Sequence, residues 1–245
     1  MYTRGSGVST GDLSRLTRFD SASRSVHFRD QPERARKGMT TQKRRRPGET
    51  RDMLMEAALT LVGRGRHFAS LGIREVTRQA EVVPTSFYRH FRNMDDLGLT
   101  LVDELGVVLR GMMREARANV LHADKLMDES VAIFVNHVQA NRNFFTFMAQ
   151  GLAGESQAIQ QGIRNEMQFF ASELANDLRN LRLLTHLSDE DLDMACELVV
   201  RTVAFSLTDI LSISPEDEAE LARIRRQTTR FLRMIFIGAD HWRSG

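Results

Sequence analysis

Apolar residues recur along the chain after residue 93 at the three- and four-residue intervals of helices that bury one face. Three stripes of this kind follow residue 93: Leu97, Leu101, Leu105, Val108, Met112 and Ala116; Val131, Phe134, Val135 and Val138; and Ile159, Ile163, Phe170, Leu174 and Leu178. Hardly any segment alternates between apolar and polar positions as a strand would. We therefore predict an all-α protein in which these long helices share one core.

Capping residues predict two more long helices near the C-terminus. The segments Ser188-Asp189-Glu190-Asp191 and Ser214-Pro215-Glu216-Asp217 each place a serine three residues before an acid, and Pro215 suits a first helical position. Their apolar stripes are Leu192, Ala195, Cys196, Val199, Val203, Leu207 and Leu211 in the first helix and Leu221, Ile224, Phe231, Leu232, Ile235 and Phe236 in the second. Both stripes are generous for the core of a single monomer.

A shorter pattern upstream predicts two smaller helices. Ile73, Val76 and Ala80 share one helical face behind Gly72, which is a tolerable N-cap. A preceding helix over residues 50–62 has a stripe that can cover their inner side: Leu54, Ala57, Ala58, Leu61 and Val62.

A third, short helix is predicted to begin at Pro84, which suits a first helical position. Phe87 and Phe91 lie four residues apart and can dock inward. The turn before this helix, near Glu81, often needs a positive φ, which glycine adopts more easily than glutamate. Helix, turn and helix form a helix-turn-helix, in which the second helix enters the major groove of DNA and the first lies across the backbone.

Hydroxyl and cationic side chains occupy the outward faces of these two helices, without paired carboxylates. The candidate DNA contacts are Arg74 in the first helix and Pro84, Thr85, Ser86, Tyr88, Arg89 and His90 in the second. Pro84 and Thr85, near the helix start, are expected to meet base edges, and the other hydroxyls are expected to meet phosphates. For this segment alone, a solvated polar face is the alternative.

Charge is distributed unevenly along the chain. The first 46 residues contain 12 Lys or Arg and 4 Asp or Glu, giving +8, and the whole chain carries +2, which leaves −6 for residues 47–245. Residues 1–38 have few large apolar side chains and are expected to be disordered, and Met39 is a second candidate start of translation. The run Lys43, Arg44, Arg45 and Arg46 can lie along or enter a minor groove, with a solvated charge cluster as the alternative.

The segment from about Gly48 to Leu109 resembles the DNA-binding domain of TetR-family transcriptional regulators. The resemblance rests on TRDMLMEAALTLV (50–62), Phe68, IREVTRQA (73–80) and SFYRHF (86–91). It is closer to the FabR-like repressors of unsaturated fatty acid synthesis in FASLGIREV (68–76), VPTSFYRHFRNMDDLGLTLVDELG (83–106) and VLRGMMREAR (108–117). Glu81, Val83 and Met94 depart from the family pattern of a turn glycine, a Ser or Thr cap and a phosphate-binding lysine.

The resemblance implies a division into a disordered basic arm (1–46), a DNA-binding domain (47–108) and a helical domain for ligand binding and dimerisation (109–245). It implies a homodimer formed through the last two helices, which suits a palindromic operator in double-stranded DNA. It also implies control of fatty acid synthesis by long-chain acyl-CoA or acyl-ACP. The helix predicted over residues 94–117 would belong to both domains and couple the two kinds of binding.

Aromatic and methionine side chains in the second domain can form an adaptable apolar pocket. The candidate lining residues are Phe134, Phe144, Phe145, Phe147, Met148, Phe169 and Phe170. Arg142, Arg164 and Arg179 are possible partners for the phosphates of a coenzyme A head group. Ordinary core packing is the alternative for the aromatic residues.

Catalytic and metal-binding motifs are missing from the sequence. The seven His are scattered, without HExxH, a Gly-rich phosphate loop or a nucleophile elbow, so we predict no enzyme activity, no cofactor and no metal. Cys196 is expected to be a buried apolar residue. No span of about 20 apolar residues and no signal-peptide core occurs, so a cytoplasmic protein without membrane contact is expected.

Two classes of function fit this pattern. The first is a ligand-gated repressor, either of fatty acid synthesis or of an efflux or catabolic operon with another hydrophobic inducer. The second is an architectural DNA-binding protein that binds through its basic arm. The recognition helix favours the first class, because non-specific binding needs mainly Lys and Arg.

Overall fold

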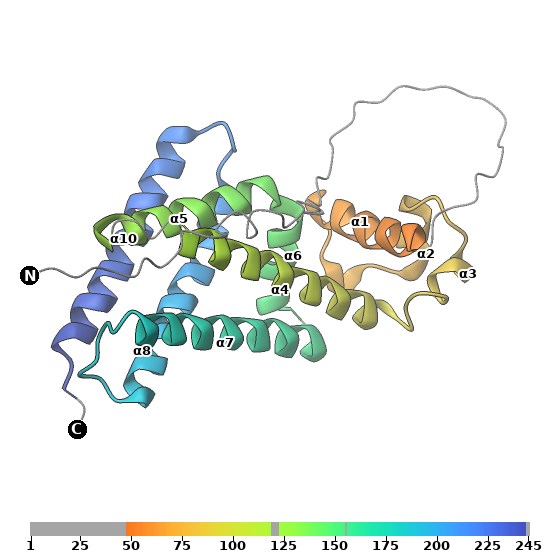
Figure 1. Cartoon of the computed structure of the whole chain (residues 1–245). Coiled ribbons are helices and arrows are strands. Elements are labelled where there is room, and N and C mark those ends of the chain that lie inside the picture. Colours follow the sequence, from red (N-terminus) through yellow and green to blue (C-terminus); the bar gives the residue numbers. More distant parts are fainter. Residues whose placement is uncertain (1–47, 119–122, 155, 244–245) are drawn as a thin grey trace, which may run out of the picture. The chain divides into compact units, whose positions relative to one another are not determined.

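The computed structural model describes residues 48–118, 123–154 and 156–243, and all regular structure within them is helical (Figure 1). The predicted all-α class is therefore confirmed. The arm of residues 1–46, with Met39 and the run Lys43 to Arg46, lies outside the described residues.

Three helices form the N-terminal part of the described chain, as predicted. They are α1 (Glu49–Gly63), α2 (Ile73–Gln79) and α3 (Pro84–Phe87), with a short 3-10 helix, η2 (Phe68–Ser70), between the first two. The predicted apolar stripes meet in one core, in which Leu54, Ala58, Val76 and Phe87 have no exposed surface. The helix-turn-helix is confirmed.

A long helix, α4 (Met94–Ala118), continues from this unit and matches the predicted shared helix. Its start is capped on both sides: the Asn93 Oδ1 accepts from the Asp96 N–H at 2.9 Å, and the Asp96 carboxylate accepts from the Arg92 N–H at 2.9 Å. Such reciprocal capping satisfies backbone donors that have no partner inside the helix.

Six further helices follow: α5 (Ala123–Ala140), α6 (Arg142–Leu152), α7 (Gln157–Asn180), α8 (Asp189–Phe205), α9 (Leu207–Ser212) and α10 (Glu218–His241). Helix α7 packs against α4 on one side and α8 on another, and α10 packs against α5 and α8 (Figure 1). Helix α6 packs against α1, so it also touches the unit that contains the helix-turn-helix. None of the described helices is both long enough and apolar enough to span a membrane.

The long helix predicted after Ser188 begins where expected, because the Ser188 Oγ accepts from the Asp191 N–H at 3.1 Å. Its predicted length is wrong: the helix ends at Phe205, and α9 begins at Leu207. The Ser206 hydroxyl donates to the Val203 carbonyl at 2.7 Å and so competes with the helical backbone. The bend lets α9 bury its Leu207 and Ile210 against α5 and α6.

The predicted start of the last helix is also wrong. Helix α10 begins at Glu218, because the Asp217 carboxylate accepts from the Glu220 N–H at 3.1 Å and acts as the N-cap. Ser214 and Pro215 lie in the preceding turn. In α10 the predicted core residue Phe231 is 47% exposed, whereas Leu221, Ile224 and Leu232 are buried.

Candidate nucleic-acid interface

Helix α3 is only four residues long, and two aromatic side chains fix it and the following turn to the core. Val83 is extended and makes no side-chain cap, and Pro84 stands at the start of the helix, as the sequence predicts. After Phe87 the chain continues as a turn, in which the N–H groups of His90 and Phe91 both donate to the Phe87 carbonyl at 2.9 Å. Phe87 and Phe91 are buried with their ring centroids 5.6 Å apart, so they fix the segment to the core.

The outward side of this segment presents the predicted contact residues. Pro84, Thr85, Tyr88 and Arg89 are exposed, while Ser86 and His90 are half-buried. Within the described ranges, none of their hydroxyl or guanidinium groups has a hydrogen-bond partner. The segment therefore offers donors to an outside acceptor without first breaking an internal bond.

The turn between α2 and α3 has a residue with positive φ, as the helix-turn-helix pattern requires, although that residue is a glutamate and not a glycine. Glu81 has φ 53°, a left-handed conformation that a non-glycine residue adopts at a cost. The Glu81 N–H donates to the Arg78 carbonyl at 3.2 Å, and the Val82 N–H donates to the Thr77 carbonyl at 2.9 Å. These two bonds make a Schellman motif, and the half-buried Val82 anchors it in the core.

The cations around the helix-turn-helix fall into two groups. Arg64 donates to Gln79 at 3.2 Å, and Arg66 pairs with Glu75 at 2.6 Å, so these two are internally engaged. Arg74 and Arg78 on α2 are exposed and have no charged partner in the described part of the chain. Sequence reasoning missed Arg78, although its position four residues after Arg74 puts both on one helical face.

Arg92 also stands near this surface and is tied to the start of α4. Its guanidinium donates to Asp96 at 3.0 Å, and this bond holds the pKa of the Asp96 carboxyl below its usual value. The same carboxylate raises the pKa of Arg92. Met94, the position at which the TetR resemblance implies a phosphate-binding lysine, is partly buried against the core.

The predicted lining residues of the second domain divide into a packed cluster and an exposed member. Phe134 on α5 and Phe144, Phe145, Phe147 and Met148 on α6 are buried in one core, and Phe170 on α7 is half-buried against that core and against the smaller one around Ala175. Phe169 is 46% exposed, with the Arg110 guanidinium 5.8 Å from its ring centroid. The structure does not bring Phe169 into the cluster, because neighbouring residues on α7 face different sides of the helix.

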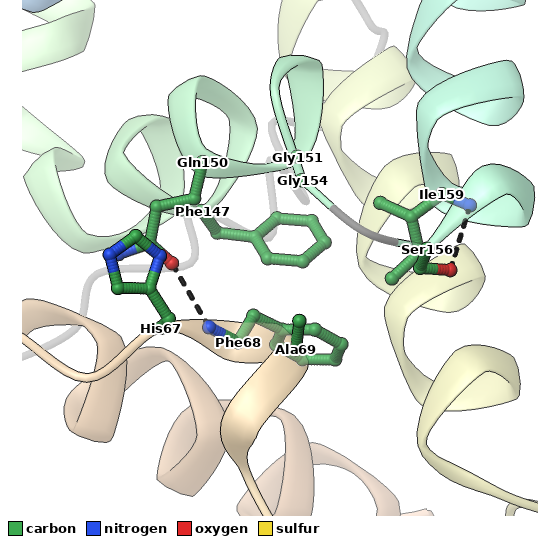
Figure 2. A pocket seen from close by; sticks show the side chains of 9 residues that line it. All are labelled: His67, Phe68, Ala69, Phe147, Gln150, Gly151, Gly154, Ser156 and Ile159. Atoms are coloured by element: carbon green, nitrogen blue, oxygen red, sulfur yellow. Dashed lines mark hydrogen bonds between the residues drawn. The ribbon is translucent and has the colours of Figure 1, made fainter.

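A small cavity lies where this cluster meets the helix-turn-helix (Figure 2). It holds about 30 Å³, which is room for a water molecule, whereas ligand pockets usually hold about 300–1,000 Å³. Its lining includes Phe68 and Ala69 from the DNA-binding unit and Phe147, Gln150 and Ile159 from α6 and α7. An acyl chain could enter the aromatic cluster only if its side chains repacked.

Two of the three arginines considered for a head group are already engaged. Arg142 donates to the Ile213 carbonyl at 3.0 Å and to Gln139, which closes the end of α9. Arg179 pairs with Asp189 at 3.0 Å and with Asp193 at 2.8 Å. Arg164 is exposed, with only a long 3.4 Å contact to Gln160.

Other chemically reactive groups give no second site. Burial raises the pKa of the Cys196 thiol to about 11, so it is an inert core residue, as predicted. Among the residues that the structure describes, no group of three or more His, Cys, Asp or Glu side chains is placed to hold a metal.

Comparison with known proteins gives a family match and several similar folds. Residues 124–236 match the family model "Tetracyclin repressor-like, C-terminal domain". The fatty acid degradation regulator FadR from Bacillus halodurans is 11% identical, with a TM-score of 0.60 over 77% of this chain and 96% of that one. FadR from Bacillus subtilis, solved in complex with stearoyl-CoA, is 12% identical, with a TM-score of 0.58 over 74% and 96%.

A putative TetR-family transcriptional regulator from Syntrophomonas wolfei is 14% identical, with a TM-score of 0.63 over 79% of this chain and 97% of that one. At these identities the structures establish a shared fold and no more.

Proposed function

We propose that this chain is a TetR-family DNA-binding transcriptional regulator and that it is a dimeric repressor of unsaturated fatty acid synthesis genes whose operator affinity responds to a long-chain acyl thioester. The family match lies in the C-terminal helices, over residues 124–236, and the prediction of no enzyme activity is part of this proposal.

The observation that carries the DNA-binding role is the unengaged polar surface of the helix-turn-helix. Thr85, Tyr88 and Arg89 project outward, and Arg74 and Arg78 extend the surface along α2. We assign Pro84 and Thr85 to base edges, because residues at the start of a recognition helix read the major groove. The hydroxyls and guanidinium groups farther along meet phosphates, which position the protein without specifying sequence.

Exposed apolar side chains on α8 and α10 support the homodimer. Met194, Leu198 and Phe205 are exposed on α8, and Phe231, Met234 and Ile237 are exposed on α10. Met194, Leu198 and Phe205 are spaced four and seven residues apart, and Phe231, Met234 and Ile237 are spaced three apart, so each set lies along one side of its helix, as in a seam that packs against other helices. The intervening position 201 is an arginine. A second copy of the chain supplies such helices in a two-fold bundle, and two-fold symmetry suits a palindromic operator.

The acyl thioester rests on two lines of support. The segments 68–76, 83–106 and 108–117 resemble the FabR-like repressors, and the fold resembles that of a FadR protein that binds stearoyl-CoA. The aromatic cluster of Phe134, Phe145, Phe147 and Phe170 is the site we assign to the acyl chain. Because the cluster has no room for an acyl chain, the ligand binds a state in which these side chains have repacked. It changes operator affinity only by the difference between its affinities for the repacked and the closed state.

A gel-shift titration with palmitoyl-CoA, oleoyl-CoA and free CoA tests this assignment. The two thioesters are expected to change operator affinity about 5- to 150-fold, and to different extents. Free CoA is the matched control, because it has the head group without the chain. Equal effects of all three compounds contradict the lipid assignment.

The small cavity beside Phe147 favours a second candidate, a compact hydrophobic inducer of an efflux or catabolic operon, since such a ligand needs less repacking. Mass spectrometry of small molecules released from the purified protein separates the two candidates.

Footprinting and three substitutions test the DNA-binding role. We expect protection of one short palindrome, whereas an architectural protein coats DNA uniformly. Tyr88→Phe and Ser86→Ala should weaken binding without changing the preferred sequence, and Thr85→Ala should change that preference. A changed preference in Tyr88→Phe, or an unchanged one in Thr85→Ala, contradicts the assigned roles.

A further inference from the structure

The side-chain amide of Gln150 on α6 holds the connection between α1 and α2 at two points. Its Oε1 accepts from the Phe68 N–H at 3.1 Å (Figure 2), and its Nε2 donates to the Arg66 carbonyl at 3.1 Å. Both partners are backbone groups, so the amide contacts the chain itself and not a side chain that can rotate away.

Two other residues of α6 face the DNA-binding unit in line with Gln150. Phe147 packs edge-on against the Phe68 ring, with centroids 4.9 Å apart. Asn143 lies so close to α1 that a Cβ added to Gly63 would be 2.0 Å from its Oδ1. The positions 143, 147 and 150 share one helical face, and that face lies along the helix-turn-helix unit.

Packing beside this contact is incomplete. The cavity of about 30 Å³ is lined by Phe68 and Ala69 on one side and by Gly151 and Ile159 on another (Figure 2). Side chains along its walls make fewer dispersion contacts than in a filled core. The directional bonds of Gln150 therefore add to the packing of Phe147 on Phe68 in holding the connection.

We propose that Gln150 is a positioning residue for DNA recognition, which sets the pose of the helix-turn-helix relative to α6. It touches no DNA itself. It acts through Arg66 and Phe68, which lead directly into α2. Because both recognition helices of a dimer must reach their half-sites at one spacing, a variable pose lowers operator affinity without altering the preferred sequence. This inference rests on the proposed DNA binding and dimer and on no particular effector.

Three variants of the full chain test the proposal. Gln150→Leu removes both hydrogen bonds. Gln150→Glu keeps the acceptor for the Phe68 N–H and removes the donor to Arg66. Gln139→Leu is the matched control, because the Gln139 amide also donates to a backbone carbonyl, that of Ile210 at 3.2 Å, but within the C-terminal helices.

Amide hydrogen exchange at Phe68 reports the contact, and operator binding reports its consequence. In Gln150→Leu we expect exchange at Phe68 to accelerate at least about tenfold and the operator dissociation constant to rise about three- to tenfold, with the same preferred sequence. Gln150→Glu should retain slow exchange at Phe68 and show a smaller loss of affinity. Gln139→Leu should change neither measurement.

Unchanged operator affinity in Gln150→Leu, together with fast exchange at Phe68, overturns the positioning role and leaves a merely structural bond. Equal losses in Gln150→Leu and Gln139→Leu overturn it as well, because they indicate general loosening of the C-terminal helices. If the unsubstituted protein binds no operator, the proposed DNA-binding function is wrong. If the unsubstituted protein and all three variants bind the operator equally well, only the role of Gln150 is wrong.

Discussion

Two surfaces of the chain differ in the kind of side chain that they expose to solvent. Around α3, the exposed groups are hydroxyls and guanidinium groups, such as those of Thr85, Tyr88 and Arg89, above a buried aromatic pair. On α8 and α10, large apolar side chains such as Leu198 and Met234 are exposed among charged ones such as Arg201 and Arg230. The first surface suits a charged, hydrated polymer, and the second suits another protein surface that excludes water.

The largest predicted effect breaks the apolar surface. Met234 is 70% exposed in the monomer and lines one surface hollow with Arg226 and Arg230. Met234→Lys should therefore leave the monomer folded while placing a further cation, among like charges, inside the proposed dimer. We expect the dimer dissociation constant to rise at least about 100-fold, because an unpaired buried charge costs several kcal/mol. Sedimentation measures the effect, with Gln168→Lys at an exposed position of α7 as the control. A Met234→Lys protein that stays dimeric would move the interface elsewhere.

The second prediction concerns the charge added to the polar surface by the N-terminal arm. Deleting residues 1–46 should reduce the magnitude of the slope of log operator affinity against log salt concentration by up to about 3 to 4. Each phosphate neutralised by Lys or Arg contributes about 0.9, and the run from Lys43 to Arg46 supplies four such side chains. Deleting residues 1–38 should do much less, since it leaves Lys43 to Arg46 in place. Binding measured at several salt concentrations decides this. Equal slopes for the two truncations refute the role given to the basic run.

A smaller predicted effect on salt dependence distinguishes arginines without an ion-pair partner in the described residues from arginines that already form one on the same surface. Arg78→Ala should reduce the salt slope by about 0.9, the share of one phosphate contact. Arg66→Ala should change the slope little, because Arg66 already pairs with Glu75 at 2.6 Å. The same titration provides the measurement. A larger effect of Arg66→Ala than of Arg78→Ala would mean that the ion pair opens to meet DNA.

The helix-turn-helix was predictable because its signals are local. Proline at the start of α3, the paired Phe87 and Phe91, and the one-sided spacing of α2 each act within a few residues. The bend at Ser206 was not predictable in the same way. Apolar residues continue at helical spacing on both sides of it, and only the packing of α9 across α5 and α6 selects the bent form.

The packing of the aromatic residues was harder to predict than the helix-turn-helix. Phe169 and Phe170 are adjacent and chemically identical, yet one is exposed and the other packs against the core. Sequence spacing did not separate them, because α7 contacts α4 on one side and α8 on another. Gln150 gave no signal either, since its partners are backbone atoms more than 80 residues away.

The smallest predicted effect is the change in stability when glycine replaces a residue with positive φ, compared between the helix-turn-helix and the C-terminal helices. Glu81 and Leu184 both have positive φ, at 53° and 55°, where glycine avoids a steric cost of about 1–2 kcal/mol. Glycine also loses more conformational entropy on folding, about 0.5–1 kcal/mol. Glu81 is exposed, so Glu81→Gly should stabilise the protein by roughly 0.5 kcal/mol, the difference between these terms.

Leu184→Gly should instead destabilise the protein, because Leu184 packs against the core that contains Leu178 and Leu192 and its removal forfeits that burial. Urea unfolding of both variants measures the two free energies. Stabilisation by both would show that backbone strain outweighs packing at Leu184. Destabilisation by Glu81→Gly would show that the Schellman motif at the end of α2 holds Glu81 without appreciable strain.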